Sequence, residues 1–150
     1  MKIVEQKYIK EFIQAGKAKI VSSEFGRLFN QYLCENHQFD VTGTRLDWSE
    51  KYINRINWLS ASEDDVELFL NKSVLSNFEN VCVIYGVTQP CLMVPFQNVV
   101  KDLDVLMCHG SGTRFLVGFN SEGCQLELAK EVFVEVDGER WLTVERGRLG

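Results

Sequence analysis

The sequence predicts an α+β domain, with N-terminal helices packed on one face of a mainly antiparallel C-terminal sheet of about six strands. Apolar residues in the first 80 positions recur at helical spacing, whereas residues 81–150 form short apolar or alternating runs separated by turn residues. The clearest turn is Asp137-Gly138, which lies between two alternating runs. A chain of 150 residues fits a single domain, 1–150, with one core.

Helices are predicted in the first half from apolar residues spaced three or four apart and from residue types that begin or end helices. Two predicted helices follow capping-box-like sequences, in which Asp47 precedes Glu50 and Ser62 precedes Asp65 by three positions. Gly26 weakens the second helix near its start. The predicted helices cover 8–16, 23–36, 47–59 and 62–70, and a loop is predicted over 37–45.

The second half is predicted to form strands because its apolar runs are short and are separated by glycine, proline or serine. Glycine-containing turns at 110–113 and 121–123 predict hairpins. The predicted strands lie near 81–85, 91–94, 105–108, 115–119, 125–128, 132–136 and 141–144, with a short helix at 98–103.

The composition excludes several classes of protein. Hydrophobic residues make up 45% and charged residues 25%, which is typical of a globular chain and argues against disorder or a coiled coil. The longest uncharged stretch, 81–100, contains Pro90 and Pro95, which argues against a membrane-spanning helix. The N-terminal residues lack the long apolar region of a secretory signal, so the cytoplasm is the expected compartment. Five cysteines without a C-x-x-C pair are typical of reduced thiols.

No catalytic motif stands out. Cys108 and His109 are the only adjacent nucleophile and possible base, but neighbouring residues on a strand point to opposite faces, so a catalytic pair would need His37 instead. The 110–113 segment lacks the G-K-[ST] ending of a phosphate-binding loop. Two distant histidines do not predict a metal site. We therefore expect neither metal nor cofactor, and a non-enzymatic function is favoured.

Acidic residues are the most distinctive feature: residues 40–79 contain eight acids and four bases, within a net charge of −5. Such a balance disfavours nucleic-acid binding and suits docking on a basic protein. Tryptophan is common at interface hot spots, and Trp58 lies in the same region. Helix caps, a solvated helix face and core packing are the alternative explanations. The predicted partner-binding residues are Asp40, Asp47, Glu50, Trp58, Glu63, Asp64, Asp65 and Glu67.

In its size, its acidity and its lack of a catalytic motif, the whole chain resembles the immunity proteins of bacterial contact-dependent growth inhibition and related toxin systems. The resemblance implies a cytoplasmic inhibitor whose acidic surface occludes the active site of a cognate toxin, commonly a nuclease with a cationic cleft. Two alternatives remain open. One is a small α+β enzyme or ligand-binding domain with a pocket between helices and sheet, and the other is an adaptor or complex subunit.

Overall fold

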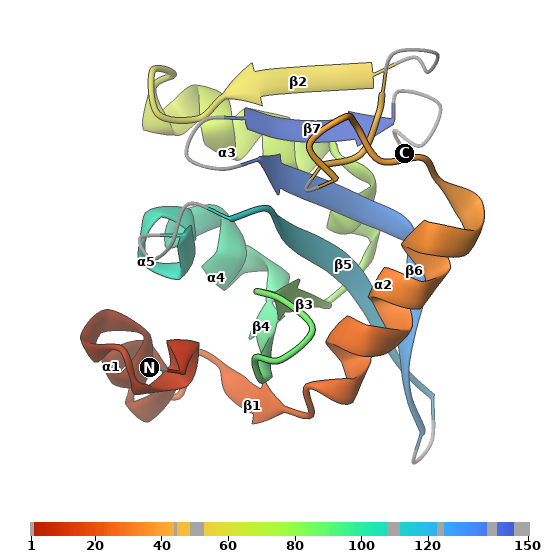
Figure 1. The fold of residues 1–150 in the computed structure, drawn as a ribbon. Helices are drawn as coiled ribbons and strands as arrows, with labels where there is room; N and C mark the ends of the chain where they lie inside the picture. The colour runs from red at the N-terminus through yellow and green to blue at the C-terminus, as the bar shows by residue number, and fades with distance from the viewer. Residues whose placement is uncertain are drawn as a thin grey trace.

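A computed structural model describes residues 2–43, 45–48, 53–107, 112–122, 125–137 and 141–145 (Figure 1). Its centre is a seven-stranded sheet in the order β1-β4-β3-β5-β6-β7-β2, in which all neighbouring strands are antiparallel. Both edge strands come from the N-terminal half of the chain. The strands are β1 (Lys19–Val21), β2 (Ile53–Asn57), β3 (Asn80–Ile84), β4 (Cys91–Pro95), β5 (Arg114–Glu122), β6 (Gln125–Asp137) and β7 (Trp141–Glu145).

Helices cover both faces of this sheet, with α2 on one side and α3 and α4 on the other (Figure 1). The predicted α+β class is confirmed, although the sheet has seven strands rather than about six and helices lie on both of its faces. The helices are α1 (Lys7–Gln14), α2 (Glu24–Asn36), α3 (Glu63–Lys72), α4 (Phe96–Lys101) and α5 (Leu103–Met107), with 3₁₀ segments at Ile3–Glu5 and Val74–Asn77.

The two faces form two cores because successive strand residues point in opposite directions. On β6, Val134 and Val136 belong to the core under α1, α3, α4 and α5, whereas Phe133 belongs to the core under α2. The buried strands therefore have few positions left for polar side chains. Glu135 is an exception, since it is only 1% exposed on the α2 face of the sheet.

The helix predicted over 47–59 is wrong: Ile53–Asn57 is strand β2, paired with β7 along its whole length. The spacing of Ile53 and Ile56 fits a helix, but as a strand these residues pack on opposite faces and contribute to both cores. The helix predicted next is confirmed as α3: Ser62 is its N-cap, and the Ser62 side chain accepts a hydrogen bond from the Asp65 amide at 3.1 Å.

Two predictions in the second half also change. Val105–Met107, predicted as a strand, belongs to helix α5, where Leu103, Leu106 and Met107 face the core at helical spacing. The strands predicted at 125–128 and 132–136 form one strand, β6, whose pairing with β5 shifts register between Val117 and Gly118. The proposed turn residues 110, 111, 123 and 138 lie outside the described residues.

Gly26 has a structural reason to be in α2. A Cβ atom at this position would lie 2.8 Å from the Gly86 carbonyl oxygen, so only glycine lets the helix approach the β3–β4 turn so closely. Packing against this turn therefore explains a glycine within the helix. No helix among the described residues is long and apolar enough to cross a membrane.

Candidate functional site

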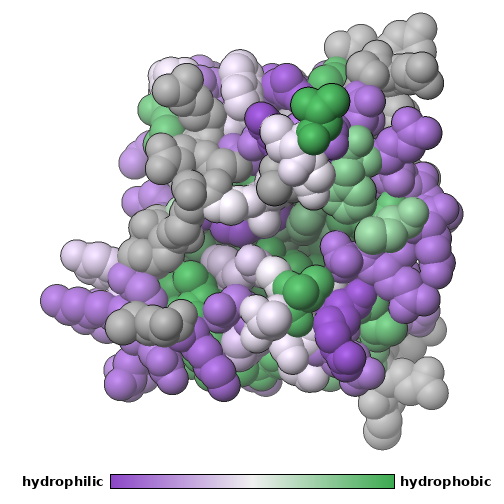
Figure 2. Space-filling view, in the orientation of Figure 1, coloured by the Kyte–Doolittle hydropathy of each residue, from purple (hydrophilic) through white to green (hydrophobic). Residues whose placement is uncertain are grey.

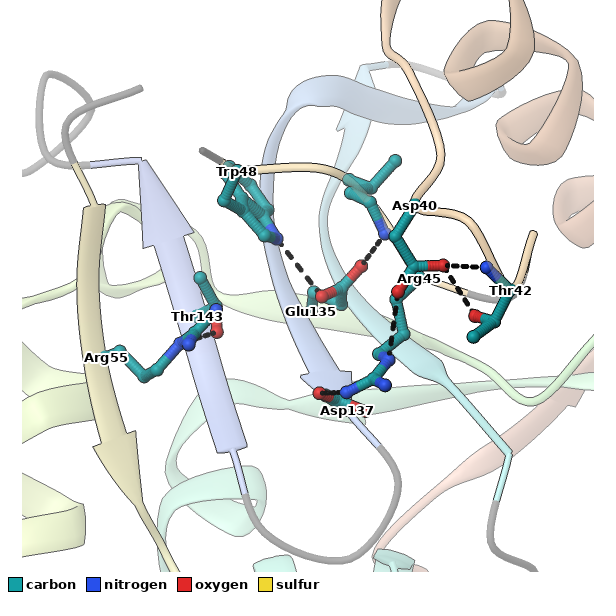
Figure 3. A network of polar contacts seen from close by, with 9 residues as sticks. Asp40, Thr42, Arg45, Trp48, Arg55, Glu135, Asp137 and Thr143 are labelled. Carbon is teal, nitrogen blue, oxygen red and sulfur yellow. Dashed lines mark hydrogen bonds and ion pairs between the residues drawn. The ribbon is translucent and has the colours of Figure 1, made fainter. Parts of the chain in front are cut away.

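A row of polar residues crosses the β6–β7–β2 end of the sheet on its α2 face. Glu135 is paired in register with Thr143, and Thr143 is paired with Arg55. Residues paired in register across antiparallel strands share a face, so the three side chains lie next to one another (Figure 3). The sheet therefore places a carboxylate, a hydroxyl and a guanidinium side by side.

The segment between α2 and β2 folds over this row as a small hairpin. Phe39 and Leu46 form a bridge, and the Asp40 and Asp47 amides donate hydrogen bonds to the Arg45 and Gln38 carbonyls, each at 2.8 Å. We call residues 37–48 the covering loop. Sequence analysis predicted a loop here, and these bonds give its described residues a defined conformation.

Glu135 holds the covering loop on the sheet (Figure 3). Its Oε2 accepts a hydrogen bond from the Leu46 amide at 2.7 Å, and its Oε1 accepts one from the Trp48 indole Nε1 at 3.1 Å. Burial raises the pKa of Glu135, although both hydrogen bonds oppose that shift. Because both oxygens are bonded and the residue is 1% exposed, this carboxyl is placed to anchor the loop rather than to act as a general base.

Arg45 closes the loop from its outer side. Its Nη1 donates to Asp137 Oδ2 at 2.7 Å, and its Nε lies 3.3 Å from Asp40 Oδ2. The Thr42 hydroxyl, which donates to Asp40 Oδ1, is the main reason that the pKa of Asp40 is lowered. Asp40 and Asp137 are therefore bound to the protein's own arginine.

A polar hollow of about 520 Å³ lies between the covering loop and strands β2, β6 and β7. Arg55 is held at its edge by a 3.1 Å hydrogen bond from Nε to Thr143 Oγ1, and its guanidinium lies 5.4 Å from the centre of the Trp141 ring. The hollow is lined by Asp40, Arg45, Leu46, Asp47, Trp48, Ile53, Arg55, Glu135, Asp137 and Trp141.

A second hollow, of about 260 Å³, lies beside α3 on the opposite face of the sheet. Trp58 and Leu59 from the β2–α3 connection form part of its wall together with apolar residues of α3, α4 and α5. The Trp58 Nε1 atom is buried and has no hydrogen-bond partner among the described residues. Three carboxylates and one amine line the same hollow: Glu63, Glu67, Asp104 and Lys101.

The sheet divides the predicted partner-binding residues into two groups. Asp40 and Asp47 lie on the covering loop, whereas Trp58, Glu63 and Glu67 line the hollow beside α3. Asp64 and Asp65 are exposed in the first turn of α3. Glu50 lies outside the described residues. Trp58 is partly buried and packs against the α3-side core.

The thiols and histidines give no catalytic pair among the described residues. His37 packs edge-on against Phe133 and Tyr32, and Cys108 and His109 are not described. Cys82 and Cys91 are buried neighbours on β3 and β4. The Cys82 thiol donates a hydrogen bond to the Cys91 sulfur. This hydrogen bond raises the pKa of Cys82 and lowers that of Cys91. No group of three or more potential metal ligands occurs in the part of the chain that the structure describes.

Sequence reasoning did not name Glu135, Arg45, Arg55 or Asp137 as site residues. One signal was present: Glu135 interrupts a strand whose neighbours Phe133, Val134 and Val136 are all apolar. An acid in a strand buried on both faces needs internal partners, because burying an unpaired charge is costly. The identity of those partners depends on the covering loop, which meets β6 only in the folded chain.

Comparison with known proteins adds no assignment: no family model matches the chain, and no curated protein or solved structure matches it significantly.

Proposed function

We propose that this protein is an inhibitor that binds a basic partner protein through the acidic surface at the first turn of α3. The supporting observation is that Glu63, Asp64 and Asp65 are exposed and that no ion pair within the described residues reaches them. Unpaired carboxylates keep their field available to a partner, which speeds association and sets specificity. We define the α3 surface as Trp58, Leu59, Glu63, Asp64, Asp65 and Glu67.

The neighbouring hollow supports protein binding at this surface. Leu59 is 57% exposed, and Trp58 lines the hollow together with the carboxylates of Glu63, Glu67 and Asp104 and the amine of Lys101. Interfaces commonly combine an apolar centre containing tryptophan with a charged rim. The resemblance to toxin-immunity proteins makes a toxin with a cationic active site, such as a nuclease, the proposed partner. Occlusion of that active site by the acidic rim is the proposed mode of inhibition.

The covering loop contributes less to this proposal. Arg45 pairs with both Asp40 and Asp137, so part of the acidic charge in this region is offset within the protein. Asp47 lies on the opposite face of the sheet from α3. A single rigid partner cannot contact both faces without reaching around the β2 edge. We therefore narrow the proposed partner-binding residues to the α3 surface.

The test is affinity capture from the native host with two charge-reversed proteins. In one, Asp64, Asp65 and Glu67 become lysine; in the matched control, the exposed residues Glu11, Glu79 and Glu127 become lysine, which changes the net charge equally. A basic protein should be retained by the wild type and by the control at low salt, and released by the α3 variant and by high salt. The captured protein's activity should fall when purified wild type is added.

Retention of the same partner by the α3 variant would remove this surface as the binding site. Capture without loss of the partner's activity would contradict inhibition. Thermal unfolding followed by circular dichroism confirms that the α3 variant is folded, which is needed because positive charge at a helix N-terminus costs about 0.3–1 kcal/mol per residue.

A further inference from the structure

A third hollow, of about 440 Å³, lies between α2 and the sheet and differs from the other two in its chemistry. In Figure 2 the middle of this face is hollowed, with apolar residues inside and more polar residues around it. Among the described residues, no acidic or basic side chain lines it. The lining consists of Gly26, Phe29, Asn30, Leu33, Phe39, Gly43, Ile84, Gly86, Val87, Gly112, Thr113 and Phe115.

Three of the described residues that line this hollow are phenylalanines. The rings of Phe29 and Phe115 meet edge-to-face with centres 5.2 Å apart, and Phe39 from the covering loop is a third ring in the lining. The ring centres of Phe29 and Phe133 are also 5.2 Å apart, so the aromatic residues of the hollow are continuous with the packed α2-side core. A planar ring in the hollow would extend an aromatic cluster already present in the protein.

Two polar side chains, Asn30 and Thr113, provide the hydrogen-bonding groups of the lining. The amide can donate and accept, and the hydroxyl can do the same. Both groups complement a hydroxyl, carbonyl or amide, and neither neutralises a charge. Burying an ionised group here would carry an uncompensated desolvation cost.

We propose that this hollow binds a small uncharged ligand that contains one or two rings and carries a hydroxyl, carbonyl or amide group. Its size falls within the range of small-molecule sites, about 300–1,000 Å³, which are likewise mostly apolar with a few polar groups. This site goes beyond partner binding and does not rest on it, because the α3 surface lies on the other face of the sheet.

The test compares 1-naphthol with 1-naphthoate, which shares its rings but carries a charge at neutral pH. Titration calorimetry on the full chain should show 1-naphthol binding at least about tenfold more tightly, since the carboxylate must lose its hydration without gaining a cationic partner. Intermolecular nuclear Overhauser effects should connect the naphthol ring with Phe29 and Phe115.

Val87 provides a variant that blocks the hollow without entering the core. It is 42% exposed and lines the hollow from the β3–β4 turn, so Val87→Trp should fill the entrance and weaken 1-naphthol binding at least about tenfold. Leu126→Trp is the matched control, because Leu126 is 47% exposed and does not line the hollow. The control should bind 1-naphthol like the wild type.

Three results would overturn the proposal: no binding of 1-naphthol to the wild type, equal binding of 1-naphthoate, or unchanged binding to Val87→Trp. A further contrary outcome is self-association that Val87→Trp abolishes without any naphthol binding, since the hollow would then be an interface between two copies of the chain. The Overhauser effects keep the test decisive if Val87→Trp unfolds.

Discussion

The covering loop and the first turn of α3 both carry clustered carboxylates, on opposite faces of the same end of the sheet. In the covering-loop region the protein uses its acids internally: Glu135 bonds to Leu46 and Trp48, and Arg45 bonds to Asp40 and Asp137. At α3 the acids face solvent, with no ion pair in the described residues. Acids can thus be structural anchors or an open surface, and the partners that the fold brings to each carboxylate decide which.

Replacing Glu135 should give the largest change in stability. Glu135→Ala leaves the Leu46 amide and the Trp48 indole without their acceptor, and each buried unsatisfied donor costs about 1–3 kcal/mol. We expect the free energy of unfolding to fall by roughly 2–5 kcal/mol in urea denaturation. Glu127→Ala, an exposed position on the same strand, is the control and should change it by less than about 0.5 kcal/mol. Equal effects would show that Glu135 is not an anchor.

Trp48 and Trp58 sharpen the comparison, because the indole of Trp48 has an acceptor and that of Trp58 has none among the described residues. Trp48→Phe removes the donor to Glu135 and should cost about 1–3 kcal/mol. Trp58→Phe removes a buried donor without a partner, which offsets the loss of volume, so the change should stay within about 1 kcal/mol. Chemical denaturation of both variants measures this difference. A larger loss for Trp58→Phe would contradict it.

The smallest expected effect is a dependence of stability on pH. Because burial raises the pKa of Glu135, the folded protein keeps this proton at pH values where the unfolded chain has lost it. The residue's contribution to the free energy of unfolding is therefore greatest below about pH 4.3, the ordinary glutamate value, and falls as pH rises through the raised pKa of the folded state.

Comparison with Glu135→Gln isolates this contribution. The free energy of unfolding of the wild type, minus that of the variant, should decrease with rising pH over this window in urea denaturation at stepped pH. Asp40 has a lowered pKa and acts in the opposite direction, losing its contribution as pH falls, but it is present in both proteins. A difference that stays constant with pH would show that Glu135 titrates normally in the folded state.

Local sequence patterns correctly predicted the elements in which apolar residues recur at the spacing of a helix or form the continuous run of a buried strand. The helix α3 was predicted from its Ser62 cap and from Val66 and Leu70, and strands β3 and β4 from their continuous apolar runs. The same reasoning failed at β2, where Ile53 and Ile56 fit a helix but the open edge of β7 supplies five in-register pairs. It also failed at α5, because in so short an element the spacing of apolar residues does not distinguish a helix from a strand.

The candidate sites were less predictable than the fold. Of the acids singled out in the sequence, those on α3 and those on the covering loop are separated by the sheet, and the buried anchor, Glu135, was not among them. Its bonds span 89 residues to Leu46 and 87 to Trp48. No local pattern encodes contacts over such separations, because they form only when β6 and the covering loop meet.

By itself, the sequence determined the α+β class, the acidic balance, the capped helix α3 and the central apolar strands, because caps, periodicity and charge are properties of neighbouring residues. Tertiary structure alone decided that 53–57 would be an edge strand and that Glu135 would hold the covering loop. It also decided that a hollow lined by three phenylalanines would form between α2 and the sheet. The reason is that strand pairing, burial and desolvation depend on which distant residues come together.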